Sequence, residues 1–76
     1  MSMNNPKPTN LLEIVTDDKD FAKALSVAKR YDIMDATRIS AFGMSLLQCY
    51  VREEDVEGLL TDCAKHQIDA YIRDDQ

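Results

Sequence analysis

Residues 46–63 read LLQCYVREEDVEGLLTDC, and residues 11–28, thirty-five positions earlier, read LLEIVTDDKDFAKALSVA. Each stretch begins with two leucines, passes through a group of acids and ends in an amphipathic pattern. Apolar residues recur there at the helical spacing i, i+3, i+4, i+7, at Phe21, Ala24, Leu25 and Ala28 and again at Val56, Leu59, Leu60 and Cys63. We therefore interpret the chain as a duplicated strand–helix–strand unit.

The acids of residues 17–20 and 53–55 mark the starts of two helices, because carboxylates are favourable at the positive end of a helix dipole. Alternating apolar and polar positions on either side of each helix predict strands. The predicted elements are a strand at Leu11–Thr16, a helix from Thr16 or Asp17 to about Tyr31, a strand at Ile33–Phe42, a turn at Gly43-Met44, a strand at Ser45–Val51, a helix from Glu53 to about His66 and a strand at Ile68–Arg73.

Two such units in tandem predict a ferredoxin-like β-α-β-β-α-β chain of the α+β class, with a four-stranded antiparallel sheet and both helices on one face. The predicted core consists of the apolar residues that face those helices, together with the helix positions that face the sheet. Its members are Leu12, Ile14, Phe21, Leu25, Leu47, Cys49, Val56, Leu60, Ile68 and Ile72.

An all-α three-helix bundle is the alternative. Ile39, Phe42, Leu46, Cys49 and Tyr50 also fit a helical stripe, and short apolar runs cannot be typed by periodicity alone. Three features favour strands. The repeat makes residues 46–51 equivalent to residues 11–16, Gly43 would cost about 1 kcal/mol inside a helix, and residues 51–53 offer no glycine or proline to turn one helix into the next.

The sheet face turned away from the helices is the candidate functional surface, because function in small folds of this kind commonly lies there or along a sheet edge. It is rather apolar for a solvated surface. We expect this face to bind a protein, with Tyr50 and Tyr71 as contact residues and Glu13 and Arg73 as charges at its rim. The predicted face consists of Leu11, Glu13, Val15, Leu46, Gln48, Tyr50, Tyr71 and Arg73.

The run GMSLLQCYVREEDVEGLL at residues 43–60 and the ending IDAYIRDD at residues 68–75 resemble small ferredoxin-like regulatory and signal-transducing domains, of the kind that includes ACT-like modules. The resemblance covers the pattern of residues 11–75. The glycine-bearing strand-to-helix loop of amino-acid-binding ACT domains is replaced here by Thr16-Asp17-Asp18 and Val51-Arg52-Glu53. The resemblance therefore implies a regulatory role but carries over no ligand.

Length and composition limit the remaining possibilities. Seventy-six residues with 45% apolar content predict one small domain, at residues 10–76, behind a flexible tail at residues 1–9. No apolar run reaches the ~20 residues that cross a bilayer, and the N-terminus lacks a signal-peptide pattern, so we expect a cytoplasmic protein without a membrane partner. Cys49 and Cys63 correspond to apolar Ile14 and Ala28 in the first repeat, which predicts buried free thiols.

No motif for catalysis, metal binding or cofactor binding stands out, so we expect neither an enzyme nor a cofactor. The two acidic groups fall at opposite ends of antiparallel helices and cannot share an ion, since hard cations require six or more oxygens. His66 is the single histidine and has no partner motif, and Gly43 and Gly58 do not form a phosphate loop.

Direct nucleic-acid binding is disfavoured by the net charge of −5. Tyr50 and Tyr71 could stack on bases as in RNA-recognition domains, but Phe42-Gly43 is the only trace of their basic, aromatic strand motif. Two function hypotheses remain. The first is a non-catalytic regulatory or protein-interaction module that acts through its open sheet face, as a homodimer or with another protein. The alternative is a small acidic inhibitor, of the anti-defence kind that mobile elements encode, which blocks a basic surface of a nucleic-acid-handling complex.

Overall fold

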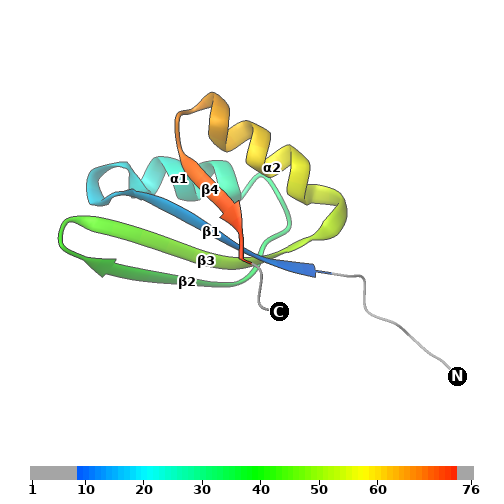
Figure 1. Cartoon of the computed structure of the whole chain (residues 1–76), viewed down its shortest axis with the longest axis horizontal. Helices are drawn as coiled ribbons and strands as arrows, with labels where there is room; N and C mark the ends of the chain where they lie inside the picture. The colour runs from blue at the N-terminus through cyan, green and yellow to red at the C-terminus, as the bar shows by residue number, and fades with distance from the viewer. Residues whose placement is uncertain (1–8, 74–76) are drawn as a thin grey trace, which may run out of the picture.

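The computed structural model of the protein describes residues 9–73, which form a four-stranded sheet and two helices (Figure 1). β3 is a strand because buried and more exposed side chains alternate along it, a period of two that a helix does not produce. The predicted α+β class is confirmed, and the all-α alternative is wrong. The elements in chain order are β1 (Thr9–Asp17), the 3-10 turn η1 (Asp18–Asp20), α1 (Phe21–Ala28), β2 (Met34–Ala41), β3 (Met44–Arg52), α2 (Glu53–Lys65) and β4 (Asp69–Ile72).

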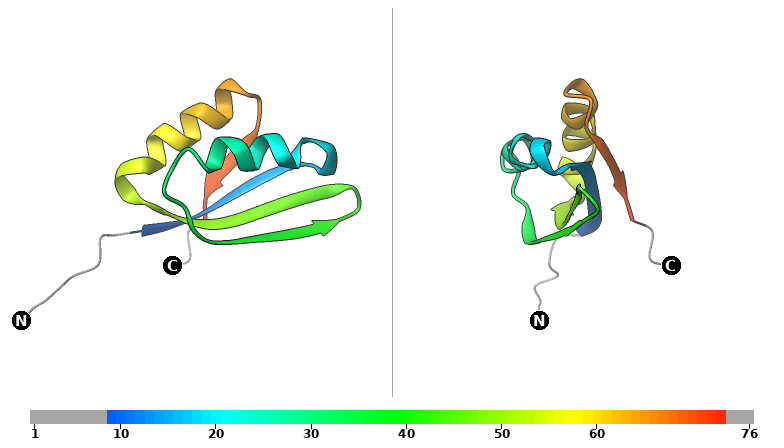
Figure 2. Two further views of the ribbon diagram at one scale, coloured as in Figure 1. Left: turned by 180° about the vertical axis from the view of Figure 1, so that it is seen from behind. Right: turned by 90° about the vertical axis from the view of Figure 1, so that its left-hand side faces the viewer.

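The strands are ordered β2-β3-β1-β4, and each neighbouring pair is antiparallel. This order is compatible with a ferredoxin-like fold. Both helices lie on the same side of the sheet (Figure 2). The side turned away from them is called the open face below. Of the predicted flexible tail, Thr9 belongs to β1, and residues 1–8 lie outside the described part of the chain.

The internal repeat reappears in the register of the two central strands. Glu13 on β1 faces Gln48 on β3, and these two residues are thirty-five positions apart. Leu11 faces Tyr50, which is the repeat counterpart of Val15, and Val15 faces Leu46, which is the repeat counterpart of Leu11. The two halves of the fold are therefore related by an approximate two-fold axis that passes through the Glu13–Gln48 pair.

The core lies between the sheet and the helices. Half of the predicted core is buried, namely Leu12, Ile14, Leu47, Cys49 and Ile68. The other half packs partly exposed against it, namely Phe21, Leu25, Val56, Leu60 and Ile72. On the helices, the most deeply buried residues correspond through the repeat: Ala24 on α1 to Leu59 on α2, and Ala28 on α1 to Cys63 on α2. The predicted stripe is thus correct, but its centre lies on these residues rather than on the larger side chains beside them.

The first helix is shorter than predicted at both ends. Residues 18–20 form the 3-10 turn η1, and the Asp18 N–H donates to the carbonyl oxygen of Gly43 at 3.0 Å instead of entering a helix. At the other end, Arg30 and Tyr31 donate to carbonyls only three residues back, at 3.1 and 3.0 Å, which tightens the chain into a turn. The α-helix is therefore limited to Phe21–Ala28.

The hairpin turn lies one residue earlier than predicted. Ala41 pairs with Met44, so the two-residue turn is Phe42-Gly43 rather than Gly43-Met44. Both turn residues have positive φ, 56° at Phe42 and 78° at Gly43, as a type I′ hairpin turn requires. Met44 accordingly belongs to β3.

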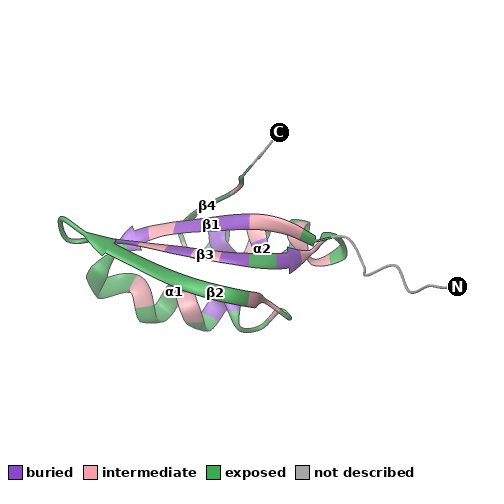
Figure 3. Cartoon of the chain, turned by 90° about the horizontal axis from the view of Figure 1, so that it is seen from below, coloured by how far each residue is buried: buried purple, intermediate pink, exposed green. Residues whose placement is uncertain are grey.

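β2 is the most exposed strand of the sheet. Every residue after Met34 is exposed, on both faces, as Figure 3 shows in the view from below. Its pairing with β3 shifts between Met34 and Thr37, where Asp35 has a φ of 54°. This irregularity is typical of a bulge in an edge strand.

Candidate functional site

The open face brings together all eight residues that the sequence analysis assigned to it. In the sheet register, Leu11 faces Tyr50, and Glu13 lies between Gln48 on one side and Tyr71 on the other. Directly opposed residues share a face. Val15 and Leu46 pair in the same way, and Arg73 follows β4, with its N–H donating to the Leu11 carbonyl oxygen at 2.8 Å. The predicted shared face is confirmed, whereas its use as a protein contact stays a prediction.

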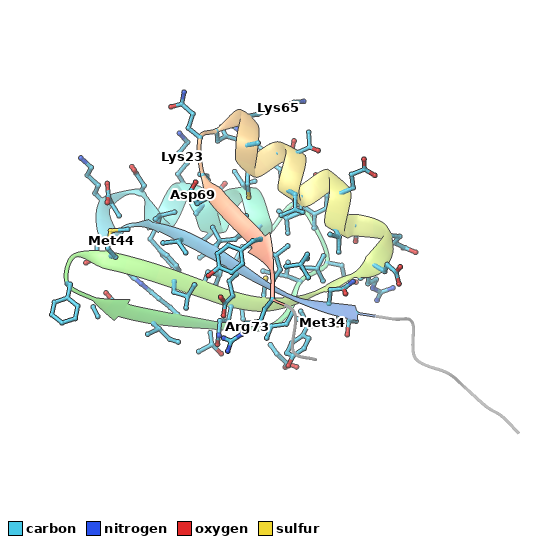
Figure 4. The ribbon with its side chains drawn as sticks, in the orientation of Figure 1. Lys23, Met34, Met44, Lys65, Asp69 and Arg73 are labelled. Carbon is cyan, nitrogen blue, oxygen red and sulfur yellow. The ribbon has the colours of Figure 1, made fainter. Side chains whose placement is uncertain are left out.

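Large apolar side chains are exposed mainly on this face. Four of the five exposed large hydrophobic residues lie there by register: Ile39 at 48%, Met44 at 41%, Tyr50 at 40% and Tyr71 at 46% exposed. Figure 4 shows Met44 at the end of the sheet that carries the β2–β3 turn and Arg73 below β4. Ile39 and Met44 were not among the residues predicted for this face, although the β-branched Thr37 and Ile39 at alternate positions indicated that Ile39 belongs to it.

Glu13 occupies the middle of the open face and is only 4% exposed. Gln48 Nε2 donates a 2.7 Å hydrogen bond to Glu13 Oε2, and Arg73 Nη1 lies 3.0 Å from the same oxygen. The prediction of Glu13 as a rim charge is therefore wrong, because its carboxylate is covered by the side chains that bind it. Arg73, which is exposed, does lie toward the outside.

The hydrogen bonds to Glu13 keep it ionised. The hydrogen bond from Gln48 lowers the pKa of Glu13 most, and those from the Tyr71 hydroxyl and Arg73 lower it further. Burial alone would raise this pKa. The same contact with Glu13 raises the pKa of Tyr71, whose hydroxyl is the donor. The Glu13 carboxylate thus holds the Gln48, Tyr71 and Arg73 side chains in place on the face.

The helix side carries the other groups singled out in the sequence. The acids of η1 and those at the start of α2 lie at opposite ends of the molecule (Figure 1), as predicted. Cys49 and Cys63 are free and buried, as predicted. His66 is the C-cap residue of α2. Within residues 9–73, no group of three or more histidine, cysteine, aspartate or glutamate side chains is arranged to hold a metal ion.

A cavity of about 190 Å³ lies at the end of the sheet, between the end of β1 and the α2–β4 connection. Its wall mixes carboxylates with Lys23 and His66. Thr16, which is also part of the wall, has a buried hydroxyl oxygen without a hydrogen-bond partner. That oxygen is shielded from solvent, so the structure does not direct it toward a ligand in the cavity. We therefore place the candidate site on the open face.

A scan against protein-family models finds no match to this chain, and a search of curated proteins finds no significant match. The resemblance to ACT-like regulatory domains accordingly stays a prediction. No helix among the described residues is long and apolar enough to span a bilayer.

Proposed function

We propose that the protein is a non-catalytic regulatory and protein-interaction module that acts from the cytoplasm through its open face, and that the occupant of this face is a second copy of the chain. The observation that carries the proposal is the concentration of exposed Ile39, Met44, Tyr50 and Tyr71 on one side of the sheet. Removing apolar surface from water stabilises an assembly by about 25 cal/mol per Å². Tyrosine suits such a contact because its ring is apolar and its hydroxyl is polar.

The size of the face allows a second copy as the occupant. With strands ~4.8 Å apart and a rise of ~3.3 Å per residue, the residues of β1, β2, β3 and β4 give an outline of roughly 480 Å² per copy. Two such faces bury on the order of 950 Å², the size of a small, weak interface. Stacking the two faces would thus cover the exposed apolar side chains of both copies.

The distribution of charge also supports self-association. The chain carries a net charge of −5, which opposes the approach of two copies. On the open face, however, Glu13 is neutralised by Arg73 at 3.0 Å. The acids of η1 and of the first turn of α2 lie away from the centre of this face. Asp69 and Asp17 share the face by register with Val15 and Met44 and add negative charge toward the end that carries the β2–β3 turn, so the repulsion is weakest around Glu13 and Arg73.

Sedimentation equilibrium of the wild type and of the double variant Tyr50→Ser/Tyr71→Ser tests the proposal. We expect a dimer for the wild type and a folded monomer for the variant, with an unchanged circular dichroism spectrum. Phe42→Ser is the matched control, because it removes an exposed aromatic ring outside the face and should leave the dimer intact. A monomeric wild type, or a double variant that stays dimeric, would contradict the proposal.

The acidic inhibitor remains a second candidate function. The observation in its favour is the group of exposed carboxylates Glu53, Glu54 and Glu57 along one helix, α2. An inhibitor of this kind would bind a basic complex through α2 with a fixed stoichiometry. Replacing the three residues with glutamine should abolish such binding while leaving self-association through the open face unchanged.

A further inference from the structure

The outer edge of β2 is an unpaired row of backbone groups. β2 stands at one end of the strand order β2-β3-β1-β4, so β3 pairs with one of its sides, and no strand within residues 9–73 pairs with the other. The opposite edge of the sheet belongs to β4, which has four residues against eight in β2. β2 therefore offers the longer free edge, and such an edge is a template for pairing with another strand.

The regular part of this edge is residues 37–41. They pair with β3 in unbroken register between the irregularity at residues 34–37 and the Phe42-Gly43 turn. The segment contains neither proline nor lysine, the residues that commonly protect an edge strand. It is exposed on both faces, as Figure 3 shows. A second strand therefore has access to its full length.

Arg38 is the one charged residue of this segment, and its side chain is turned back over the sheet. Its Nε and Nη2 atoms donate to Ser45 Oγ on β3 at 3.2 and 2.9 Å, and Nη2 lies 3.7 Å from Asp18 Oδ1. The guanidinium carbon lies 4.1 Å from the centroid of the Phe21 ring. These contacts hold the side chain away from the outer edge, so it does not shield the backbone there.

The hairpin turn determines which backbone groups point outward. In a two-residue turn the flanking residues, here Ala41 and Met44, form a hydrogen-bonded pair. Such pairs alternate with non-hydrogen-bonded ones along an antiparallel ladder. The N–H and C=O groups of residues 37, 39 and 41 are therefore directed toward β3. Those of Arg38 and Ser40 are directed toward the free edge.

A second copy of β2 matches this edge in one antiparallel register. When the pairing is centred on Ile39, Arg38 of each copy faces Ser40 of the other, and all of residues 37–41 are paired. Centring it on Arg38 would place two arginines opposite each other, which is destabilising. Centring it on Ser40 would oppose Arg38 to Phe42, which belongs to the turn. The regular segment is therefore self-complementary about its own midpoint.

Ile39 adds an apolar contact at that midpoint. It lies on the open face, opposite Leu46 on β3, and is 48% exposed. In this register it meets Ile39 of the second copy in a non-hydrogen-bonded pair, the kind in which side chains approach most closely. The two-fold axis runs perpendicular to the sheet, so the open faces of both copies lie on the same side.

We propose that the β2 edge is a second self-association surface, on which β2 of another copy pairs antiparallel about Ile39 to form one eight-stranded sheet. This contact is separate from the open face, which it leaves uncovered. The joined open face has an outline of roughly 960 Å², and stacking two such sheets buries on the order of 1,900 Å², within the range of stable interfaces. Pairing over five residues is a small contact, so we expect it at protein concentrations well above those that form the open-face dimer.

Sedimentation equilibrium in the Tyr50→Ser/Tyr71→Ser background isolates the edge from the open face. We expect a monomer at low protein concentration and a dimer at high concentration. Adding Ser40→Pro removes an outward N–H and should weaken this association at least tenfold. Adding Ser40→Ala is the matched control, because it removes the same hydroxyl contact with Asp18 but keeps the N–H. A background variant that is monomeric at every concentration, or equal association of the two Ser40 variants, would overturn the edge pairing. The open-face proposal is judged separately, by the dilute wild type.

Amide hydrogen exchange tests the same edge in the wild type, without any substitution. Raising the protein concentration should slow exchange of the Arg38 and Ser40 N–H groups at least tenfold. The N–H groups of residues 37, 39 and 41 already bond to β3, so their exchange should change little. An equal effect at all five residues, or none at Arg38 and Ser40, would contradict the proposal.

Disulfide formation tests the register. Non-hydrogen-bonded partners have Cα atoms ~4.5 Å apart, a distance that a disulfide spans. Ile39→Cys should therefore form a covalent dimer on oxidation with diamide, and Thr37→Cys should do so at least tenfold more slowly. Both positions lie on the open face, so stacking of that face does not favour position 39, and the native cysteines are buried. Equal rates for the two variants would overturn the pairing about Ile39.

Discussion

The Tyr31 hydroxyl donates a 2.6 Å hydrogen bond to Asp62 Oδ2, which joins the turn after α1 to the last turn of α2. Gly58 leaves room for the tyrosine ring, since a Cβ atom there would lie 3.2 Å from the hydroxyl oxygen. The two helices are thus connected by a specific polar contact at the edge of the apolar core.

This contact predicts an alkaline dependence of stability. The hydrogen bond that Tyr31 donates to Asp62 is the main cause that raises the pKa of this tyrosine above its ordinary value of 10.0. The contact therefore stabilises the fold fully below pH 10 and is lost as the pH rises through the higher folded pKa. Urea denaturation between pH 7 and 11 should show a steeper alkaline loss for the wild type than for Tyr31→Phe. Tyr50→Phe controls for removal of a hydroxyl, and equal slopes for all three proteins would refute the prediction.

Glu13 predicts the opposite dependence at acid pH. Its pKa is held below the ordinary value of 4.5, chiefly by the hydrogen bond from Gln48. Its contribution is present above pH 4.5 and is lost as the pH falls through the folded pKa. We expect Glu13→Gln to lower the unfolding free energy at pH 7 by about 1–2 kcal/mol, as for a shielded charge-assisted hydrogen bond, and to flatten the acid limb of the stability curve. The exposed Glu57→Gln should change neither quantity.

Replacing Gln67, just after α2, with glycine should increase the stability of the protein. Gln67 has a φ of 60°, and the N–H groups of Gln67 and Ile68 donate to the carbonyls of Ala64 and Cys63 at 3.0 and 2.8 Å, which is a Schellman motif. Glycine avoids the Cβ penalty of the left-handed region but gains entropy when unfolded. Gln67→Gly should therefore raise the unfolding free energy by about 0.5–1 kcal/mol net, whereas Gln67→Ala should give no gain. A loss in Gln67→Gly would contradict this account.

The two cysteines should be unreactive in the folded protein. Both thiols are buried, and burial raises the pKa of Cys49 to about 11. Because the thiolate is the nucleophile, dithionitrobenzoate should label neither cysteine before unfolding and both in denaturant. Ala64→Cys, at an exposed position of α2, supplies a reactive control. If Cys49 or Cys63 were labelled in the native protein as fast as the cysteine introduced by Ala64→Cys, the core would have to open easily.

The elements of the fold were predictable because the same pattern occurs twice. The repeat assigned residues 46–51 to a strand where periodicity alone left a helix possible, and the structure has β3 there. The turn was misplaced for a local reason. Phe42 is a typical strand residue, and the sequence lacks the Asn-Gly pair that marks a type I′ turn. The 3-10 turn η1 depends on the bond between Asp18 and Gly43, a contact between distant residues that no local pattern contains.

Strand alternation in the sequence predicted which residues share the open face, but it did not predict how deeply each of them is buried. Glu13 is covered because Gln48, Tyr71 and Arg73 converge on it from two other strands, and this depends on strand order and register. Met44 was missed because the displaced turn removed it from the strand. The full exposure of β2 likewise depends on where the helices lie, since α1 packs on β1 and α2 packs on β1, β3 and β4.

The approximate two-fold axis through Glu13 and Gln48 has a consequence for what the centre of the sheet can contain. At the axis of a true symmetric pair, a residue always meets a copy of itself. Two glutamates there would repel each other, and two glutamines would remove the carboxylate that accepts from Arg73. Joining the halves in one chain removes that restriction, so an acceptor on β1 can meet a donor on β3. Covalent continuity thus permits a chemically unequal pair at the single point where symmetry would have forbidden one.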